Sequence, residues 1–237
     1  MAEPGCMERP PRMAGASAVT AGGPPALVES FCNARGLDYL ASLGEFEALS
    51  EMSKVCADGR RLVAHALMQT ARRHQRAAIR LSSVGALGAL AAEAQDAVTR
   101  SCIAAVAGTF KDSVPKVRLC AARVLADIAQ RAVLRDLSLV ERCVSALEAS
   151  ALSDGAGAVR QVAMRALGGF AMVPEARRGD VALRCVRLLT AKGLSDISSI
   201  VRIETADALA KVAVAAHGEQ PRLARRCVSA CMAAITA

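Results

Sequence analysis

The amino-acid sequence predicts an all-α fold, an α-solenoid in which antiparallel helix pairs stack one on the next. Its composition favours helices, because 53% of the 237 residues are hydrophobic but only 2% are aromatic. The core must therefore be filled by small aliphatic side chains, Met and Cys, which pack well between helices. A segment beginning Val-Arg recurs every 42 residues, at Val117, Val159 and Val201, and a cysteine-containing segment recurs between the copies. Two segments that alternate at a fixed period predict a repeat protein with two helices in each unit.

The chain is basic, with a formal net charge of +8 and a pI of about 9.3. This charge leaves nucleic acid, an anionic membrane surface and an acidic protein open as partners. A charged fraction of 22% and a mean hydropathy of +0.31 exclude wholesale disorder, because the chain can bury enough apolar surface to fold. The longest uncharged run, residues 13–28, contains Gly and Pro, so no membrane-spanning helix is predicted.

The cysteines and the N-terminus indicate the compartment. The nine cysteines are odd in number and most lie in apolar helical stretches, which favours reduced thiols over disulfides. The first residues lack the basic-then-apolar order of a secretory signal. We therefore expect a soluble intracellular protein, located in the cytoplasm or the nucleus.

Three parts follow one another along the chain. Residues 1–25, rich in Pro, Gly, Ala and Ser, predict a flexible tail. Residues 26–56 carry scattered Leu and Phe and predict irregular N-terminal capping helices. Residues 57–237 contain the repeats and predict about four helix pairs, each with an A helix followed by a B helix, and a final unpaired A helix. The predicted pairs cover residues 57–92, 96–131, 136–173 and 178–217, and the unpaired helix begins near residue 220.

The B helices share a pattern of Arg, then Leu seven positions later and Ala eleven positions later, which lie on one helix face. The arginines are Arg80, Arg118, Arg160 and Arg202, and the leucines are Leu87, Leu125, Leu167 and Leu209. The A helices share a buried-type cysteine at Cys102, Cys143, Cys185 and Cys227. These equivalences predict that the leucines and cysteines form the core between stacked helices.

An aspartate stands six positions before the arginine in three of the units. The pairs are Asp112 with Arg118, Asp154 with Arg160, and Asp196 with Arg202. Each aspartate can cap the start of its B helix, where its charge suits the positive end of the helix. Because the pairs recur at the 42-residue period in three successive units, we interpret them as a structural ladder between neighbouring units and not as a catalytic array.

An apolar A helix, a turn with Asp and a B helix opening Val-Arg resemble the HEAT repeat of the armadillo-like superfamily. The resemblance covers about residues 57–237, and the first pair departs from it because His74 stands in the aspartate position. Residues 111–129 are most similar to repeats of scaffold and regulatory subunits of Ser/Thr protein phosphatases. The resemblance implies a scaffold or regulatory adaptor without catalysis, which presents the concave face of its B helices to a protein partner.

The candidate binding residues lie on the outward stripe of the B helices. They are Arg123, Asp127, Gln161, Arg165, Glu204, Asp207 and Lys211. Charges of both signs suit a polar protein partner better than a phosphate backbone, which favours uniform Lys and Arg.

No catalytic residue, metal site or cofactor is predicted. Equivalent helices of a solenoid lie about 10 Å apart, so the periodic cysteines cannot join in a disulfide or share one zinc ion. The three histidines are isolated in the sequence and form no ligand cluster with neighbouring residues.

Two alternatives stay open. Basic clusters around Arg72 to Arg80 and Arg222 to Arg226 could instead bind nucleic acid or tubulin. The last predicted helix places Val228 on an apolar side with no B helix after it. We therefore expect either a fragment of a longer array or an open end that a partner or a second copy covers. In both cases the isolated chain should self-associate through this uncapped helix.

Overall fold

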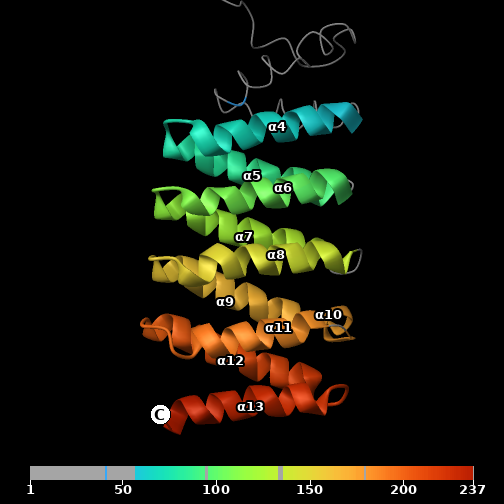
Figure 1. Cartoon of the computed structure of the whole chain (residues 1–237), viewed down its shortest axis with the longest axis vertical. Coiled ribbons are helices and arrows are strands. Elements are labelled where there is room, and N and C mark those ends of the chain that lie inside the picture. The colour runs from blue at the N-terminus through green and yellow to red at the C-terminus, as the bar shows by residue number, and fades with distance from the viewer. Residues whose placement is uncertain (1–40, 42–56, 94–95, 133–135, 179, 237) are drawn as a thin grey trace, which may run out of the picture.

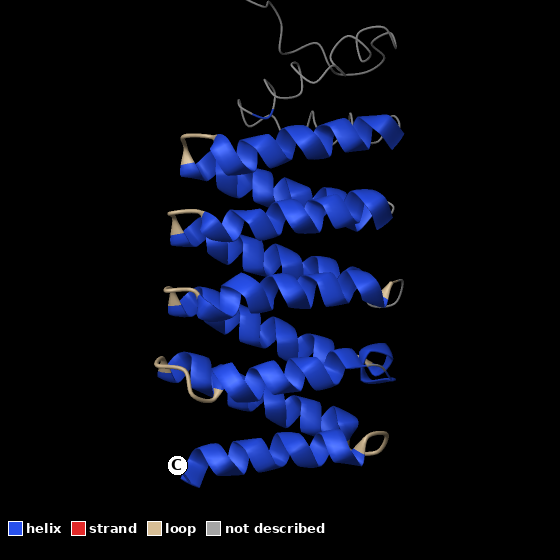
Figure 2. Ribbon diagram, viewed as in Figure 1, coloured by secondary structure: helices blue, strands red, loops and turns tan. Residues whose placement is uncertain are grey.

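A computed structural model of the chain describes residues 41, 57–93, 96–132, 136–178 and 180–236. Within these residues every regular element is helical and no strand occurs (Figure 2). The helices stack as antiparallel pairs along one axis (Figure 1). The predicted all-α solenoid of antiparallel helix pairs is confirmed. The predicted tail and, apart from Ala41, the predicted capping helices lie outside the described residues.

Long helices alternate between two layers. The A helices are α4 (Ala57–Arg73), α6 (Asp96–Gly108), α8 (Leu137–Ser150), α11 (Asp180–Leu188) and α13 (Pro221–Thr236). The B helices are α5 (Ala77–Glu93), α7 (Pro115–Ala132), α9 (Gly157–Met172) and α12 (Ser199–Ala216). In Figure 1 the A helices lie across the stack and the B helices run obliquely between them. None of the described helices is long and apolar enough to cross a membrane.

Short irregular turns close the A helices on the side of the aspartates. A single 3-10 turn ends the A helix in the second and in the third unit, over Thr109–Lys111 and Ala151–Ser153. In the fourth unit a π-helical turn, Leu189–Gly193, takes that place. The structure also contains α10 (Pro174–Arg178), a short helix before α11 that the repeat pattern does not predict. Its start at Pro174 fits the preference of proline for the first position of a helix.

One continuous apolar core runs through the stack. The four equivalent leucines of the B helices, Leu87, Leu125, Leu167 and Leu209, are fully buried. The four equivalent cysteines of the A helices are also fully buried. The residues that recur in sequence are therefore the ones that hold neighbouring helices together, as the periodicity indicates.

The B helices approach one another closely where one of them carries glycine. A Cβ atom on Gly168 of α9 would lie 2.6 Å from the Cβ of Ala208 on α12. A Cβ on Gly88 of α5 would lie 2.7 Å from Val124 on α7. The B layer makes more extensive helix-to-helix contacts than the A layer along the stack. Glycine is thus required at these two positions because no larger residue fits between the helices.

Candidate functional site

Each aspartate of the predicted ladder folds the turn that leads into its B helix. Its Oδ1 accepts a hydrogen bond from the backbone N–H two residues later, at 2.8 Å in all three turns. The amides belong to Val114, Ala156 and Ser198. These bonds reach the residue just before each helix and not the amides of its first turn, which were the expected targets of the cap. The aspartate therefore sets the direction in which the chain enters the helix.

Each paired arginine joins its own turn to the next unit of the stack. Its Nη1 donates to the backbone carbonyl six residues earlier, and its Nε and Nη2 donate to the carboxylate of the following unit. For Arg118 these distances are 2.8 Å to the Asp112 carbonyl, and 2.6 and 2.9 Å to the Asp154 carboxylate. Arg80 pairs in the same way with Asp112, and Arg160 with Asp196. The arginine thus bonds the aspartate of the next unit and only the backbone of its own aspartate.

This array, which we call the ladder, is largely buried and remains charged. The side chains of its three aspartates are only 5–7% exposed. In Asp112 and Asp196 the arginine hydrogen bond is the main influence, and it lowers the pKa below its ordinary value. In Asp154 burial is the largest influence and would raise the pKa, but the bonds from Arg118 and the turn amide lower it overall. The hydrogen bond to aspartate raises the pKa of each paired arginine in turn.

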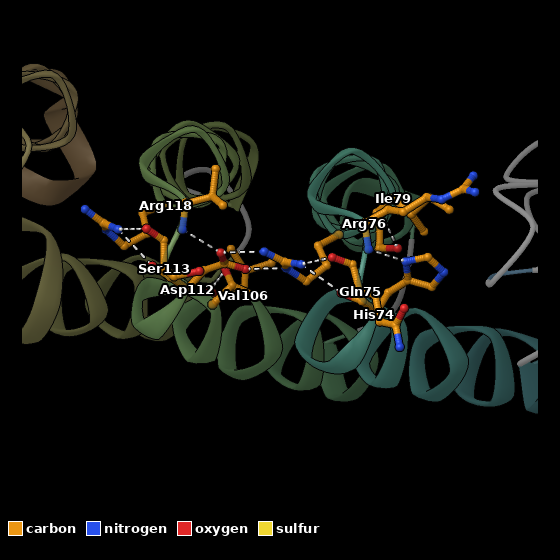
Figure 3. Close-up of polar contacts among 12 residues, drawn as sticks. His74, Gln75, Arg76, Ile79, Val106, Asp112, Ser113 and Arg118 are labelled. Carbon is orange, nitrogen blue, oxygen red and sulfur yellow. Dashed lines mark hydrogen bonds and ion pairs between the residues drawn. The ribbon is translucent and has the colours of Figure 1, made fainter.

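The two ends of the ladder differ from its middle. At the first turn the Nδ1 atom of His74 accepts from the backbone N–H of Arg76 at 3.0 Å, so the imidazole takes over the role of the aspartate in the turn (Figure 3). At the last turn Arg202 keeps the bonds to its own turn, at 2.8 Å to the carbonyl of Asp196 and 3.3 Å to that of Ile197. No carboxylate meets the Nε edge of Arg202 within the described part of the chain.

The predicted binding residues on the B helices fall into two groups. Arg123 and Asp127 on α7 are exposed, and their side chains make no hydrogen bond or ion pair with any described residue. The other five contact one another, in a cluster of three and a pair. These are Gln161 with Arg165 and Glu204, and Asp207 with Lys211.

The cluster joins two B helices. Arg165 on α9 donates to both carboxylate oxygens of Glu204 on α12, at 2.8 and 2.6 Å, and Gln161 donates to one of them at 3.0 Å. The Arg165 side chain is 64% exposed, whereas that of Glu204 is 14% exposed. The hydrogen bond from Arg165 lowers the pKa of Glu204. Sequence reasoning placed these residues on the binding face, and the structure adds a role in holding α9 to α12.

No protein-family model and no curated protein sequence matches this chain. Solved structures of designed proteins resemble it in outline. An engineered protein is 19% identical over 88% of this chain and 96% of its own, with a TM-score of 0.48. A designed armadillo repeat protein in complex with the peptide (KR)4 is 17% identical over 89% and 98%, with a TM-score of 0.45. Computationally designed armadillo repeat proteins for modular peptide recognition give 17% identity, the same coverage and a TM-score of 0.46.

These neighbours carry no functional detail over to the chain. Its architecture rests on its own helices, and its candidate sites rest on its own side chains.

The four equivalent cysteines of the A helices are not reactive. Burial raises the pKa of Cys102, Cys143 and Cys185 to about 12 and that of Cys227 to about 11. A thiol with so high a pKa stays protonated and is a poor nucleophile at neutral pH. Among the described residues no three His, Cys, Asp or Glu side chains gather closely enough to hold a metal ion.

Sequence reasoning missed a set of contacts around the short helix α10. Arg177 is 7% exposed and donates to the Met172 carbonyl at 2.8 Å and to the Glu219 carboxylate at 2.9 Å. The side-chain amide of Gln220 donates to the backbone carbonyl of Arg177. The 42-residue separation of Arg177 and Glu219 equals the repeat length, which is the signal that could have indicated this contact.

Proposed function

We propose that the chain is a non-catalytic scaffold that binds a protein partner across the exposed face of its B helices. The observation that carries this proposal is the row of charged and polar side chains from α7 to α12, here called the B-face row: Arg123, Asp127, Gln161, Arg165, Glu204, Asp207 and Lys211. The first two of these have no partner among the described residues, so their charges are available to another molecule.

The signs of these charges favour a polypeptide as the partner. Arg123 and Asp127 stand one helical turn apart with opposite charges, and Asp207 and Lys211 repeat the arrangement with the signs exchanged. A phosphate backbone would be repelled by the carboxylates, whereas a peptide with both kinds of charged side chain can match the row. The close packing of the B layer supports its assignment as the inner, concave side of the solenoid.

A finer proposal concerns the class of partner. The similarity of residues 111–129 to repeats of phosphatase scaffold and regulatory subunits suggests the catalytic subunit of a Ser/Thr protein phosphatase. The buried and protonated thiols suit a reducing compartment, and we propose the cytoplasm or the nucleus. Copurification of phosphatase activity with the full chain would support this proposal, and its absence from all captured complexes would contradict it.

The scaffold proposal is tested by exchanging two charges without altering the net charge. Arg123→Glu with Asp127→Lys reverses the free pair on α7, and affinity capture with quantitative mass spectrometry compares the partners of this variant with those of the wild type. We expect the main partner to be reduced about tenfold, while the free energy of unfolding changes by less than about 0.5 kcal/mol because both side chains are exposed.

The matched control lies on the opposite layer. Glu141→Lys with Arg142→Glu exchanges two exposed charges of α8 and should leave the captured partners unchanged. Equal loss with both variants, or no loss with either, would contradict the assignment of the binding face to the B helices.

The alternative, binding to nucleic acid or tubulin, is favoured by exposed arginines at two places. They are Arg72, Arg73 and Arg76 near the end of α4, and Arg222, Arg225 and Arg226 at the start of α13. Arg80 does not belong to the first group of exposed arginines, because its guanidinium group pairs with Asp112. If the chain binds duplex DNA or RNA, its affinity should fall by about tenfold or more between low and moderate salt. Arg222→Gln, Arg225→Gln and Arg226→Gln together should then reduce this binding.

A further inference from the structure

The turns that join each A helix to its B helix form one edge of the stack, which we call the turn edge. In Figure 2 these turns lie one below another along the left side of the molecule. The turn edge comprises residues 72–78, 111–116, 153–158 and 192–200. Its carboxylates are the three ladder aspartates, whose side chains are only 5–7% exposed and are each bound by an arginine. Within these residues no exposed carboxylate therefore offsets the exposed cations.

Five exposed cations gather at the first two of these turns. They are Arg72, Arg73, Arg76, Lys111 and Lys116, and we call them the basic patch. The Arg72 guanidinium lies against the end of α6, because a Cβ atom on Gly108 would be 3.0 Å from its Nη2 atom. Arg72 thus brings the cations of the first turn next to those of the second. None of the five side chains forms an ion pair with a described residue.

The third turn keeps the shape of the second turn but not its charge. Ser153 stands where the second turn has Lys111, and Ala158 stands where it has Lys116. The aspartates of both turns accept a hydrogen bond from the backbone amide two residues later, at 2.8 Å in each case. Since the same turn forms without lysine, the two lysines are not required by the fold and are available to a ligand.

We propose that the basic patch binds the phosphate backbone of a duplex nucleic acid that lies along the turn edge, without reading its sequence. This inference rests on nucleic-acid binding, the second of the two functions proposed above, and assigns that binding to a surface. Exposed cations of one sign suit a row of phosphates, which bind Lys and Arg and release their own counterions. Contacts to phosphate position a protein on the duplex and carry no sequence information. The B-face row contains carboxylates that would repel phosphates, and the basic patch contains none.

The placement of the aromatic side chains favours a duplex over a single strand. Proteins that bind single strands use exposed rings on which the bases stack. Phe110 and Phe170 are the aromatic residues in the described part of the chain, and they are only 7% and 1% exposed. Phe110 directly precedes Lys111 on the second turn, yet its ring is buried in the core. A ligand at the basic patch would therefore meet charged side chains and no surface for stacking.

The other cluster of arginines lies in a more acidic setting. Arg222, Arg225 and Arg226 belong to the start of α13, and in Figure 1 this start lies on the opposite side of the stack from the end of α4. Arg222 and Arg226 line a groove that also contains Asp180 and Glu219. These carboxylates would repel a phosphate backbone, so the basic patch is the better match for a duplex.

The test measures binding of the full chain to a fluorescent DNA duplex by anisotropy at several salt concentrations. Lys111→Gln with Lys116→Gln removes two charges from the basic patch. We expect this variant to bind about tenfold more weakly, and the slope of log affinity against log salt to fall by about 2. As a control of equal charge, Arg142→Gln with Arg187→Gln removes two exposed charges from the A layer and should weaken binding by less than about threefold.

A variant that gains charge extends the test to the third turn. Ser153→Lys with Ala158→Lys places lysines at the positions that match those of the second turn, and both residues are exposed. We expect this variant to bind about tenfold more tightly and its salt slope to rise by about 2. A DNA duplex of unrelated sequence should bind equally well, and an RNA duplex of the same sequence shows which nucleic acid supplies the phosphates.

Several results would overturn the proposal. Equal weakening by the patch and control variants, an unchanged salt slope, or no gain from the added lysines would each reject the basic patch as the site but leave nucleic-acid binding in place. The absence of duplex binding at low salt would reject both the site and the function on which it rests. A polyglutamate peptide that binds the basic patch more tightly than the duplex would assign the patch to an acidic polypeptide.

Discussion

Arg160 and Arg202 hold equivalent positions one repeat apart, yet their surroundings differ. Both donate through Nη1 to the carbonyl of the aspartate six residues earlier, at 2.7 and 2.8 Å. Arg160 also binds the Asp196 carboxylate and its side chain is 8% exposed, whereas Arg202 is exposed and has no carboxylate partner in the described part of the chain. The local sequence therefore determines how the turn folds, and the neighbouring unit determines whether the charge is paired and buried.

The largest expected effect on stability comes from removing an apolar side chain that is buried between two units. The same change at an exposed apolar residue of the last B helix should have little effect. Leu167→Ala on α9 should lower the free energy of unfolding by about 2–5 kcal/mol, because the side chain is completely buried between units and leaves a cavity. Ile203→Ala on the open side of α12 should change it by less than about 0.5 kcal/mol, since that side chain is already 68% exposed. Urea unfolding of both variants tests the comparison, and similar losses would mean that the end of the stack is covered in solution.

The same comparison applies to the arginines. Arg160→Met should lower the free energy of unfolding by about 3 kcal/mol, because it leaves the buried Asp196 carboxylate without its main partner. Arg202→Met should lower it by less than about 0.5 kcal/mol, because no carboxylate of a described residue depends on that side chain. Thermal unfolding followed by circular dichroism measures both, and equal effects would contradict the role of the neighbouring unit.

Two adjacent glycines of α9 give a smaller effect of opposite sign. Gly168→Ala should destabilise the chain by about 1–3 kcal/mol, because the new methyl group meets Ala208 on α12 and the helices must move apart. Gly169→Ala should stabilise it by up to about 1 kcal/mol, since nothing lies within 4 Å of the added Cβ and alanine favours the helix. Denaturant-induced unfolding of the two variants measures both changes. Stabilisation by both substitutions would contradict the close approach of α9 to α12.

Acid should weaken the ladder before it affects the apolar core. The pKa of Asp112, Asp154, Asp196 and Glu204 is lower in the folded chain than its ordinary value of about 4, so the unfolded chain binds protons first as the pH falls. Their contribution to stability is complete at neutral pH and is lost as the pH falls below about 4 toward the folded pKa values. Asp196→Asn should flatten the decline of unfolding temperature with acid. An unchanged slope would show that Asp196 titrates alike in both states.

Most of this fold could be predicted from the repeat, because the core leucines, the cysteines and the aspartates recur at a spacing that only equivalent helices explain. The Asp and Arg residues also predicted a ladder, since complementary charges recurred at three successive turns. The start of α10 was not predictable from the repeat, because the positions 42 residues before and after Pro174 hold alanine and not proline.

The binding surface was less accessible to sequence reasoning. Gln161, Arg165 and Glu204 occupy different positions in their own helices, and no other unit repeats the combination. Periodicity therefore placed them on the outer face but could not show that they bind one another across α9 and α12. The sequence also could not show that Arg202 lacks a carboxylate partner among the described residues, because the sequence around Arg202 matches that around the paired arginines.

The most direct test of coupling between units is a double-mutant cycle on Arg160 and Asp196. Arg160→Met, Asp196→Asn and the combined variant are unfolded in urea at neutral pH, and Asn keeps an acceptor for the Ser198 amide so that the turn is preserved. A buried, bidentate pair should give a coupling energy of at least about 1.5 kcal/mol, with the double variant more stable than the sum of the single losses implies. Additive losses within about 0.3 kcal/mol would show that the two residues act independently and would contradict the ladder as the link between units.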